Sequence, residues 1–273
     1  MNSQLRNHSD GISANQRQYL KAHRRHHHII SLLRILLIVA FLSIWELAAR
    51  LKWIDVFFFS SPSGIVIYLY HMILDHSFFT HTGITLLEII VSFLLVTLFS
   101  LLTATILWYV HGLAEVLEPY LVILNSLPKS ALAPLLIVWL GTGTNTIIVA
   151  GISVAIFGSI INLYTGFCQA DSEMLKLIYT LGGNRRDALL KVILPSSIPL
   201  ILSNMKVNIG LSLVGVIIGE FLAARRGLGY LIIYGSQVFQ LSMVITSIII
   251  LCAIAMAFYK LIQSLEHYYR KKY

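Results

Sequence analysis

Residues 171–199 read DSEMLKLIYTLGGNRRDALLKVILPSSIP, and they form the only long polar interval between the apolar segments in the second half of the chain. Apolar residues recur at helical spacing over residues 172–181, which predicts a first short helix. Gly182 and Gly183 then release the backbone, because glycine tolerates positive φ and commonly closes helices. Asn184 can cap a second helix. The interval is therefore predicted to be a helix pair bent at the two glycines.

The second predicted helix is amphipathic and basic. Its polar side carries Arg185, Arg186 and Lys191. Its apolar side carries Leu189, Leu190 and Ile193. Asp187 lies in its first turn, where a carboxylate suits the helix dipole, and Pro195 and Pro199 mark the entry to the next segment. A rigid, basic, bent helix pair between two membrane spans suits the docking of a soluble partner. The alternative interpretation is an ordinary amphipathic loop on the membrane surface.

Four residues of this interval fall at a recognisable spacing: Gly182, Val192, Leu194 and Pro195. They resemble the conserved cytoplasmic loop of ABC importer permeases, Gly-x9-Ile-x-Leu-Pro. The chain looks most like the branch for nitrate, taurine, aliphatic sulfonates and thiamine-precursor pyrimidines. The resemblance covers roughly residues 35–265. Its other matching stretches are Ser61-Pro62-Ser63, Leu127-Pro128 through Pro134, Trp139-Leu140-Gly141, Gly219-Glu220 and Gly227-Leu228-Gly229-Tyr230.

The resemblance implies that this loop forms the coupling helices of a type I ABC importer permease with a MetI-like fold, which sit in a groove of the ATPase subunit. The residues that it assigns to ATPase coupling are Leu181, Gly182, Gly183, Arg185, Arg186 and Pro195. One departure concerns the Glu-Ala-Ala that opens the family loop, because Lys176, Leu177 and Ile178 stand at those positions here. The acidic contact is therefore absent, while the glycine hinge and the basic helix remain.

The composition indicates a polytopic membrane protein. Hydrophobic residues make up 57% of the chain and charged residues 12%, about half the charged share of an average soluble domain. The net charge of +8 is explained better by cytoplasmic flanks that face anionic lipid than by nucleic acid. No Gly-x4-Gly-Lys-Ser/Thr sequence is present, so the chain is not expected to bind a nucleotide through a P-loop. Cys168 and Cys252 suggest neither a disulfide framework nor a metal site.

Six apolar segments recur along the chain, and only helices satisfy the backbone of such segments inside a bilayer. They are residues 35–49, 85–110, 120–140, 144–167, 200–223 and 243–262. Each except the first is near the ~20 residues that a membrane-spanning helix needs, and the first reaches that length if Arg34 snorkels. The sequence thus predicts an all-α membrane protein with six transmembrane helices.

The predicted organisation has three parts. A six-helix permease domain at residues 32–266 contains the coupling loop at 171–195 and lies between basic tails at 1–31 and 267–273. In the first tail, a solvated basic segment is favoured over a metal site at His26-His27-His28, because no acidic or cysteine partner is near in the sequence.

Lysine and arginine residues set the predicted orientation. Six helices place the N-terminal tail, the loop after the second span, the 171–195 loop and the C-terminus on one side, which carries most of the extramembrane basic residues. That side is expected to be cytoplasmic, and the resemblance implies the plasma membrane of a bacterial cell. On the outer side, residues 51–81 and 225–240 are expected to be loops. They either anchor helix ends in the interface or, in a permease, also receive a substrate-binding protein.

The third span contains residues that could line a solute path, namely Asn125, Pro128 and Lys129. Pro128 and Pro134 free backbone carbonyls, which a membrane tolerates where protein or a water-filled cavity satisfies them. Lys129 costs about 2.5–3.5 kcal/mol at the bilayer centre on insertion scales, so it is expected to face protein or water. It is interpreted either as an electropositive lining for an anion or as a lysine that snorkels to the cytoplasmic headgroups.

The fifth span ends with Gly215, Gly219 and Glu220. Glycines at this spacing allow close helix packing. Glu220 is expected near the outer mouth of the path, where it braces a gate or pairs with Arg225.

Further polar residues lie within the spans. Asn162, Asn208 and Ser212 are interpreted either as lining of the path or as interhelical hydrogen-bond partners, which is the commoner role of such residues. Glu46 and Glu88 lie toward opposite ends of the first two spans and are expected to be solvated.

The leading hypothesis is the transmembrane permease subunit of an ATP-driven ABC importer for a small anionic or heterocyclic solute. ATP and Mg²⁺ are then expected on a separate ATPase subunit, with no cofactor on this chain, which is not an enzyme. The other expected partners are a second copy of the chain, a substrate-binding protein and membrane lipid. The alternative is a secondary transporter driven by an ion gradient, against which the sequence shows neither paired repeats nor a carboxylate pair at the midplane.

Overall fold

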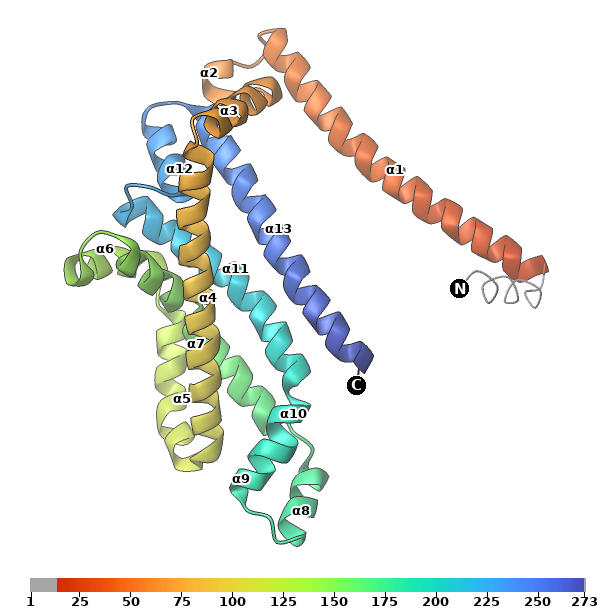
Figure 1. Cartoon of the computed structure of the whole chain (residues 1–273), viewed down its shortest axis with the longest axis vertical. Coiled ribbons are helices and arrows are strands. Elements are labelled where there is room, and N and C mark those ends of the chain that lie inside the picture. Colours follow the sequence, from red (N-terminus) through yellow and green to blue (C-terminus); the bar gives the residue numbers. More distant parts are fainter. Residues whose placement is uncertain (1–13, 273) are drawn as a thin grey trace. The chain divides into compact units, whose positions relative to one another are not determined.

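The computed structural model describes residues 14–272, and every regular element within that range is a helix (Figure 1). The predicted all-α class is therefore confirmed. The chain divides into two units, residues 1–64 and 65–273. By length and composition, five helices in the described range can cross a membrane, or six if a sharply bent pair counts as one span.

The first unit contains α1 (Ala14–Arg50), α2 (Val56–Phe59) and the start of α3 (Pro62–Leu74). The apolar part of α1 runs from Leu32 to Arg50, and the preceding tail is helical from Ala14. The side chains of His26-His27-His28 lie outside the described residues. The segment after α1 was predicted to be a loop, but it contains α2 and α3. Local signals account for this, because the carboxylate of Asp55 accepts the Phe57 N–H at 2.9 Å and Pro62 starts α3.

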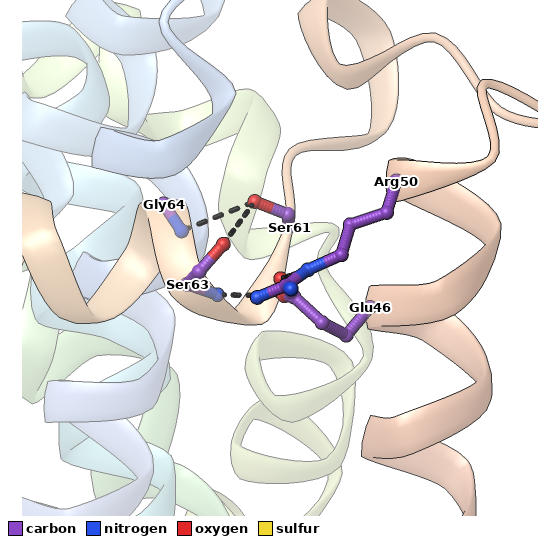
Figure 2. Close-up of polar contacts among 5 residues, drawn as sticks. All are labelled: Glu46, Arg50, Ser61, Ser63 and Gly64. Carbon is purple, nitrogen blue, oxygen red and sulfur yellow. Dashed lines mark hydrogen bonds and ion pairs between the residues drawn. The ribbon is translucent and has the colours of Figure 1, made fainter.

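The Ser61-Pro62-Ser63 stretch joins the end of α1 to the start of α3 (Figure 2). The hydroxyl of Ser61 accepts the Gly64 N–H at 3.1 Å and caps α3. Glu46 accepts the Ser63 N–H at 3.0 Å through one oxygen and the Arg50 Nε–H at 2.8 Å through the other. The predicted solvated carboxylate of Glu46 is thus a structural link within the first unit.

Three long helices form the centre of the second unit. They are α4 (Ser77–Tyr109), α7 (Thr144–Cys168) and α11 (Ile198–Ala223). Ile89, Phe93, Ile147 and Val216 from these helices share one apolar core. The predicted spans at these positions are confirmed, although α4 begins eight residues before residue 85.

Close packing of α7 against α11 depends on glycine, as predicted for the Gly215 and Gly219 spacing. A Cβ added to Gly215 would lie 2.8 Å from the carbonyl oxygen of Ala150 and 2.8 Å from Cα of Gly151. A Cβ added to Gly219 would lie 3.0 Å from Cα of Ile147. The two backbones therefore approach each other along a seam that has no room for a side chain.

Gly215→Ala is expected to destabilise the protein, whereas Gly210→Ala in the same helix is not. Alanine gains about 1 kcal/mol of helix propensity over glycine at either site. At Gly215 the added methyl meets rigid backbone, and overpacking costs about 1–3 kcal/mol. At Gly210 the added Cβ meets no atom within 4 Å. Thermal unfolding of both variants in the same detergent measures the difference, and equal melting temperatures would contradict this account of the seam.

The third predicted span is two helices, α5 (His111–Ser126) and α6 (Lys129–Leu140), which meet at 95°. Residues 120–140 were predicted to form one span, but the helix is broken. Pro128 carries no N–H and disfavours the helical conformation in the residue before it, and Leu127 is extended, at φ −62° and ψ 138°. The sequence thus indicated where the helix is interrupted, but not the angle between α5 and α6.

The two ends of the second unit differ. Helix α12 (Leu228–Gln237) and the start of α13 (Leu241–Lys272) lie at one end, packed through Leu228, Leu231 and Met243. The loop between α7 and α11, with its helices α8 and α9, lies at the opposite end (Figure 1). Residues 225–240 were predicted to be a loop, yet most of them form α12. An ion pair between Lys206 of α11 and Glu266 of α13 joins these two helices.

Candidate functional site

The polar interval that follows α7 folds into four short helical pieces. They are α8 (Ser172–Thr180), α9 (Arg185–Ala188), the π-helical turn η1 (Leu189–Ile193) and α10 (Leu194–Ser196). The carboxylate of Asp171 caps α8 by accepting the Glu173 N–H at 2.8 Å. The predicted pair of helices with a break at the glycines is confirmed.

Gly182 and Gly183 close α8 for two different physical reasons. Gly182 has φ +82°, in the region that favours glycine, and a Cβ added there would meet no atom within 4 Å. Gly183 donates its N–H to the Ile178 carbonyl at 2.9 Å, and an added Cβ would lie 2.9 Å from the same carbonyl oxygen. Gly182 therefore supplies the turn, and Gly183 allows the chain to pass close to the end of α8.

Asn184 and Asp187 form a reciprocal cap at the start of α9. The Asn184 side chain accepts the Asp187 N–H at 3.0 Å, and the Asp187 carboxylate accepts the Asn184 N–H at 3.1 Å. Lys191 lies 2.9 Å from the same carboxylate. Hydrogen bonds from Lys191 and then from the Asn184 backbone hold the pKa of Asp187 below its usual value. The cap thus stays charged at neutral pH and fixes the direction in which α9 leaves the turn.

The second half of the loop is anchored in the bundle. Leu189 and Ile193 are buried in one apolar cluster with Phe167 of α7 and Ala104 of α4. Leu190 was predicted to share this apolar side, but it is 52% exposed. The π-helical turn at η1 explains the difference, because its wider repeat changes which residues share a face.

Arg185 attaches the loop to the end of α4. Its Nη2 donates to the backbone carbonyl of Trp108 at 2.8 Å, and its guanidinium carbon lies 5.4 Å from the centre of the Trp108 ring. Arg186 is exposed beside it. Both predicted coupling arginines are exposed, and Arg185 is the one that contacts the end of α4. The sequence did not indicate this role for Trp108, because no local pattern links residues that are 77 positions apart.

An apolar surface remains exposed on α8. Met174 and Leu177 are each 53% exposed, and Leu181, just after the helix, is 75% exposed. These three residues are called the α8 patch below. Their spacing of three and four places them on one face of the helix. Leu175 and Ile178 are half-buried instead. The loop thus presents apolar side chains away from its anchored side, at one end of the second unit.

Four of the residues proposed for a solute path are exposed or half-buried. Asn125, Pro128 and Asn162 are exposed and Lys129 is half-buried. Asn125 Oδ1 lies against Gly158 of α7, 3.1 Å from the position of an added Cβ. The structure therefore brings the break and the accessible face of α7 together.

The ammonium group of Lys129 has local partners. It donates to the carbonyl of Leu124 and, at 3.1 Å, to that of Asn125. It also lies 5.4 Å from the centre of the Phe157 ring. The lysine thus binds carbonyls at the end of α5 that the break leaves without helical partners. The two roles considered from the sequence, an electropositive lining and a snorkelling lysine, did not include this capping contact.

Asn208 and Ser212 of α11 are buried between helices. Asn208 is 1% exposed and Ser212 is 0% exposed. The amide of Asn208 donates to Ser159 Oγ at 2.9 Å, and Ser159 in turn donates to Ser100 Oγ at 2.8 Å. Asn162 donates to Asn204 Oδ1 at 2.9 Å. Asn162 and Asn208 therefore make interhelical hydrogen bonds, the commoner of the two roles considered.

Glu220 is 0% exposed and organises the opposite end of the bundle. Its Oε1 accepts the Thr85 hydroxyl of α4 at 2.6 Å, and its Oε2 accepts the Gly229 N–H of α12. The Leu228 N–H donates to Thr85 Oγ1 at 2.8 Å. Glu220 thus holds α12 against α4 and α11. It has these partners rather than Arg225, whose side chain is exposed.

The expectation that Glu88 is solvated is wrong. Its side chain is buried at 1% exposure, close enough to the Glu220 carboxyl group to interact with it directly. Hydropathy gives no sign of this, because the burial depends on α11 and α12 covering one face of α4. The bundle therefore contains a carboxyl pair, which the sequence did not reveal, near α12 rather than in the middle of the spans.

Within the described residues, no group of three or more His, Cys, Asp or Glu side chains is placed to hold a metal ion. The features of the second unit are an anchored polar loop with an exposed apolar patch at one end and a carboxyl-braced helix at the other. Together with the apolar spans, they define a multi-pass α-helical membrane protein.

Comparison with known proteins identifies the family. Residues 96–270 match the model described as "Binding-protein-dependent transport system inner membrane component". A "Probable ABC transporter permease protein" of Haemophilus influenzae is 33% identical over 87% of this chain and 97% of its own length. The formylaminopyrimidine transport permease protein ThiX of Halalkalibacterium halodurans is 28% identical over 68% of this chain and 74% of its own. The chain belongs to the family of binding-protein-dependent transport system inner membrane components.

A solved structure supports the fold. The MetNI methionine ABC transporter in inward-facing conformations contains a chain that matches with a TM-score of 0.58 and 18% identity. The match covers 70% of this chain and 94% of that chain. The arrangement of helices is therefore that of an ABC transporter permease.

Proposed function

We propose that the chain forms the solute path of an ATP-driven importer and transmits the motion of a separate ATPase subunit to that path. The observation that carries the proposal is the loop between α7 and α11. It is anchored to α4 through Arg185 and to the bundle through Leu189 and Ile193, while the α8 patch is exposed. A partner that binds the α8 patch can therefore move the bundle through the anchored second half of the loop.

The proposed cycle has two states. ATP binding, with Mg²⁺, closes the ATPase pair, and the displaced loop rocks the bundle so that the path opens outward; hydrolysis resets it. The chemistry resides on the ATPase, and this chain contributes a difference in packing between the two states. Because one copy encloses little space, two copies are proposed to form the path, with the loop and both termini in the cytoplasm. The α12 end then faces the substrate-binding protein.

A small anionic or heterocyclic solute is proposed. ThiX is named for formylaminopyrimidine transport, and other similar permeases are named for aliphatic sulfonates and taurine. Asn125 and Lys129, at the α5–α6 break, and Asn162 of α7 are at least partly accessible and provide amide groups and one positive charge. Such groups suit a sulfonate or a pyrimidine.

Mild-detergent purification of the chain from its own cells, followed by mass spectrometry, tests the proposal. An ATPase with a P-loop is expected to copurify in equal amount, and ATP hydrolysis is expected to rise when the matching substrate-binding protein is added. Leu181→Asp, which places a charge in the α8 patch, is expected to release the ATPase, while Thr180→Asp, next to it and also exposed, serves as the control. Recovery of the chain alone in several mild detergents would favour a transporter driven by an ion gradient.

Lys129→Met is expected to reduce uptake of an anionic solute, whereas Lys129→Arg is expected to retain most of it. The methionine removes the positive charge at the break and leaves the carbonyls of Leu124 and Asn125 without the ammonium group. Uptake by proteoliposomes that contain the assembled importer measures the effect. Unchanged uptake of an anionic solute by Lys129→Met would show that Lys129 caps α5 and does not bind the solute.

A further inference from the structure

A groove runs between α11 and α13 on the surface of the second unit. Ile209 of α11 and Ile262 of α13 join the two helices in one apolar core. Beside this contact, Ile209, Gly210, Ala255 and Met256 line a cavity of about 340 Å³. Gly210 is exposed, and a Cβ added to it would meet no atom within 4 Å. The absence of a side chain at Gly210 thus leaves the groove open.

The groove lies at the depth of the hydrocarbon core. Both helices are long and apolar enough to cross a membrane, at Ile198–Ala223 and Leu241–Tyr268. Gly210 and Met256 lie near the middle of these two ranges. Residues in the middle of a span contact lipid or protein rather than bulk water. The occupant of the groove is therefore apolar, either an acyl chain or a segment of protein.

The same face of α13 becomes polar toward its C-terminal end. Met256, Lys260, Gln263 and His267 recur at spacings of three and four, which places them on one face of the helix. Lys260, Gln263 and His267 are exposed and line a second cavity, of about 640 Å³. From Met256 to His267 the helix rises about 16 Å, which is close to half of the ~30 Å hydrocarbon core. An acyl chain in the groove therefore brings its headgroup to these polar side chains.

The polar end of this face carries an excess of positive charge. Lys260 is followed in the sequence by the basic run at 270–272. Glu266 is the one acidic residue between positions 257 and 273, and its carboxylate pairs with Lys206 of α11. Basic pockets between transmembrane helices bind anionic lipid headgroups on the cytoplasmic side. The apolar groove and the basic end thus match the two parts of an anionic phospholipid.

We propose that α11 and α13 form a binding site for an anionic phospholipid. One acyl chain lies in the groove against Gly210 and Met256. The phosphate lies at the C-terminal end, where the ammonium group of Lys260 attracts it and the side chains of Gln263 and His267 donate hydrogen bonds to its oxygens. A zwitterionic lipid brings its own cation to the same basic surface and is expected to bind more weakly. The site is independent of the proposed function, and only its assignment to the cytoplasmic leaflet uses the proposed orientation.

Native mass spectrometry of the full chain in mild detergent tests the proposal with phosphatidylglycerol and phosphatidylcholine that carry the same acyl chains. Phosphatidylglycerol is expected to bind about fivefold more tightly or better, and its advantage is expected to fall as the salt concentration rises. Glycerol phosphate, which has the charge but no acyl chain, is expected not to compete. Equal affinity for the two lipids, or displacement of phosphatidylglycerol by glycerol phosphate, would overturn the proposal.

Lys260→Gln tests the headgroup end of the site. The substitution removes one positive charge and is expected to lower the affinity for phosphatidylglycerol about fivefold, while the affinity for phosphatidylcholine stays the same. Lys176→Gln is the matched control, because Lys176 is an exposed lysine of α8, outside the groove. An equal loss in both variants, or no loss in Lys260→Gln, would show that Lys260 does not hold the phosphate.

Gly210→Leu tests the acyl-chain end. The leucine fills the groove and is expected to weaken binding of both lipids. Gly112→Leu is the control, since Gly112 is an exposed glycine of α5 whose added Cβ also meets no atom within 4 Å. If Gly210→Leu leaves lipid binding unchanged and instead separates a dimer into single chains, the groove holds a second copy of the chain and the proposal is wrong. A chain that binds no ATPase would overturn the proposed function and leave these lipid affinities as they are.

Discussion

Gly182→Glu is expected to leave membrane insertion intact and to weaken ATPase binding by at least about tenfold, or ~1.4 kcal/mol. Gly182 has φ +82° at the turn between α8 and α9, and an added Cβ meets no neighbouring atom within the chain. The added side chain therefore causes no steric clash at its Cβ. The backbone strain of about 1–2 kcal/mol for a residue with a Cβ in the left-handed region distorts the turn. The acidic side chain also follows directly after Leu181 of the α8 patch.

Gly141→Glu is the matched control for this prediction. Gly141 ends α6 with φ +78°, and a Cβ added there also meets no atom within 4 Å. It precedes α7, whereas the loop follows the other end of that helix. Both variants thus carry similar backbone strain and the same new charge, but only one lies in the loop. Copurification of the ATPase with each variant, normalised to the amount of chain, measures the difference, and equal retention would show that Gly182 has no part in docking.

Arg185→Met is expected to uncouple ATP hydrolysis from transport while the ATPase remains bound. The substitution removes the hydrogen bond to the Trp108 carbonyl at 2.8 Å and the contact with the Trp108 ring. The apolar cluster around Leu189 and Ile193 still holds the loop in the bundle. The connection from the loop to α4 is therefore lost, and ATPase motion no longer reaches that helix fully. Solute transported per ATP hydrolysed is expected to fall about tenfold, equivalent to ~1.4 kcal/mol of coupling.

Arg186→Met provides the comparison, because Arg186 is the neighbouring exposed arginine. Its loss is expected to alter affinity for the ATPase at most and to leave the ratio of transport to hydrolysis unchanged. The ratio is measured in proteoliposomes at saturating ATPase subunit, which removes any effect on affinity. If both variants, or neither, lower the ratio, the contact between Arg185 and Trp108 does not carry the coupling.

Local signals were sufficient for much of the fold. Apolar segments long enough to span a bilayer occur at α4, α7, α11 and α13, and the spans predicted there are confirmed. The turn at Gly182 and Gly183 and the cap at Asn184 follow from properties of those residues and their immediate neighbours. Such features depend on interactions within a few positions, so a single sequence contains them.

Other features depended on contacts between distant segments. Arg185 looked like a free basic residue until its contact with Trp108 appeared, and Glu88 looked solvated until α11 and α12 covered it. Pro128 marks where the 95° turn between α5 and α6 occurs, but the local sequence does not specify the angle.

The sequence by itself determined that this protein is helical, crosses the membrane and carries a hinged polar loop of a recognisable family. Hydropathy, glycine conformation and helix capping act locally, and each is written in consecutive residues. Only the tertiary structure decided which arginine of the loop is anchored, which side chains of α8 remain exposed and that two carboxyl groups share one buried site. Burial and hydrogen-bond partnership are properties of segments brought together from 77 to 135 residues apart, and no single stretch of sequence specifies them.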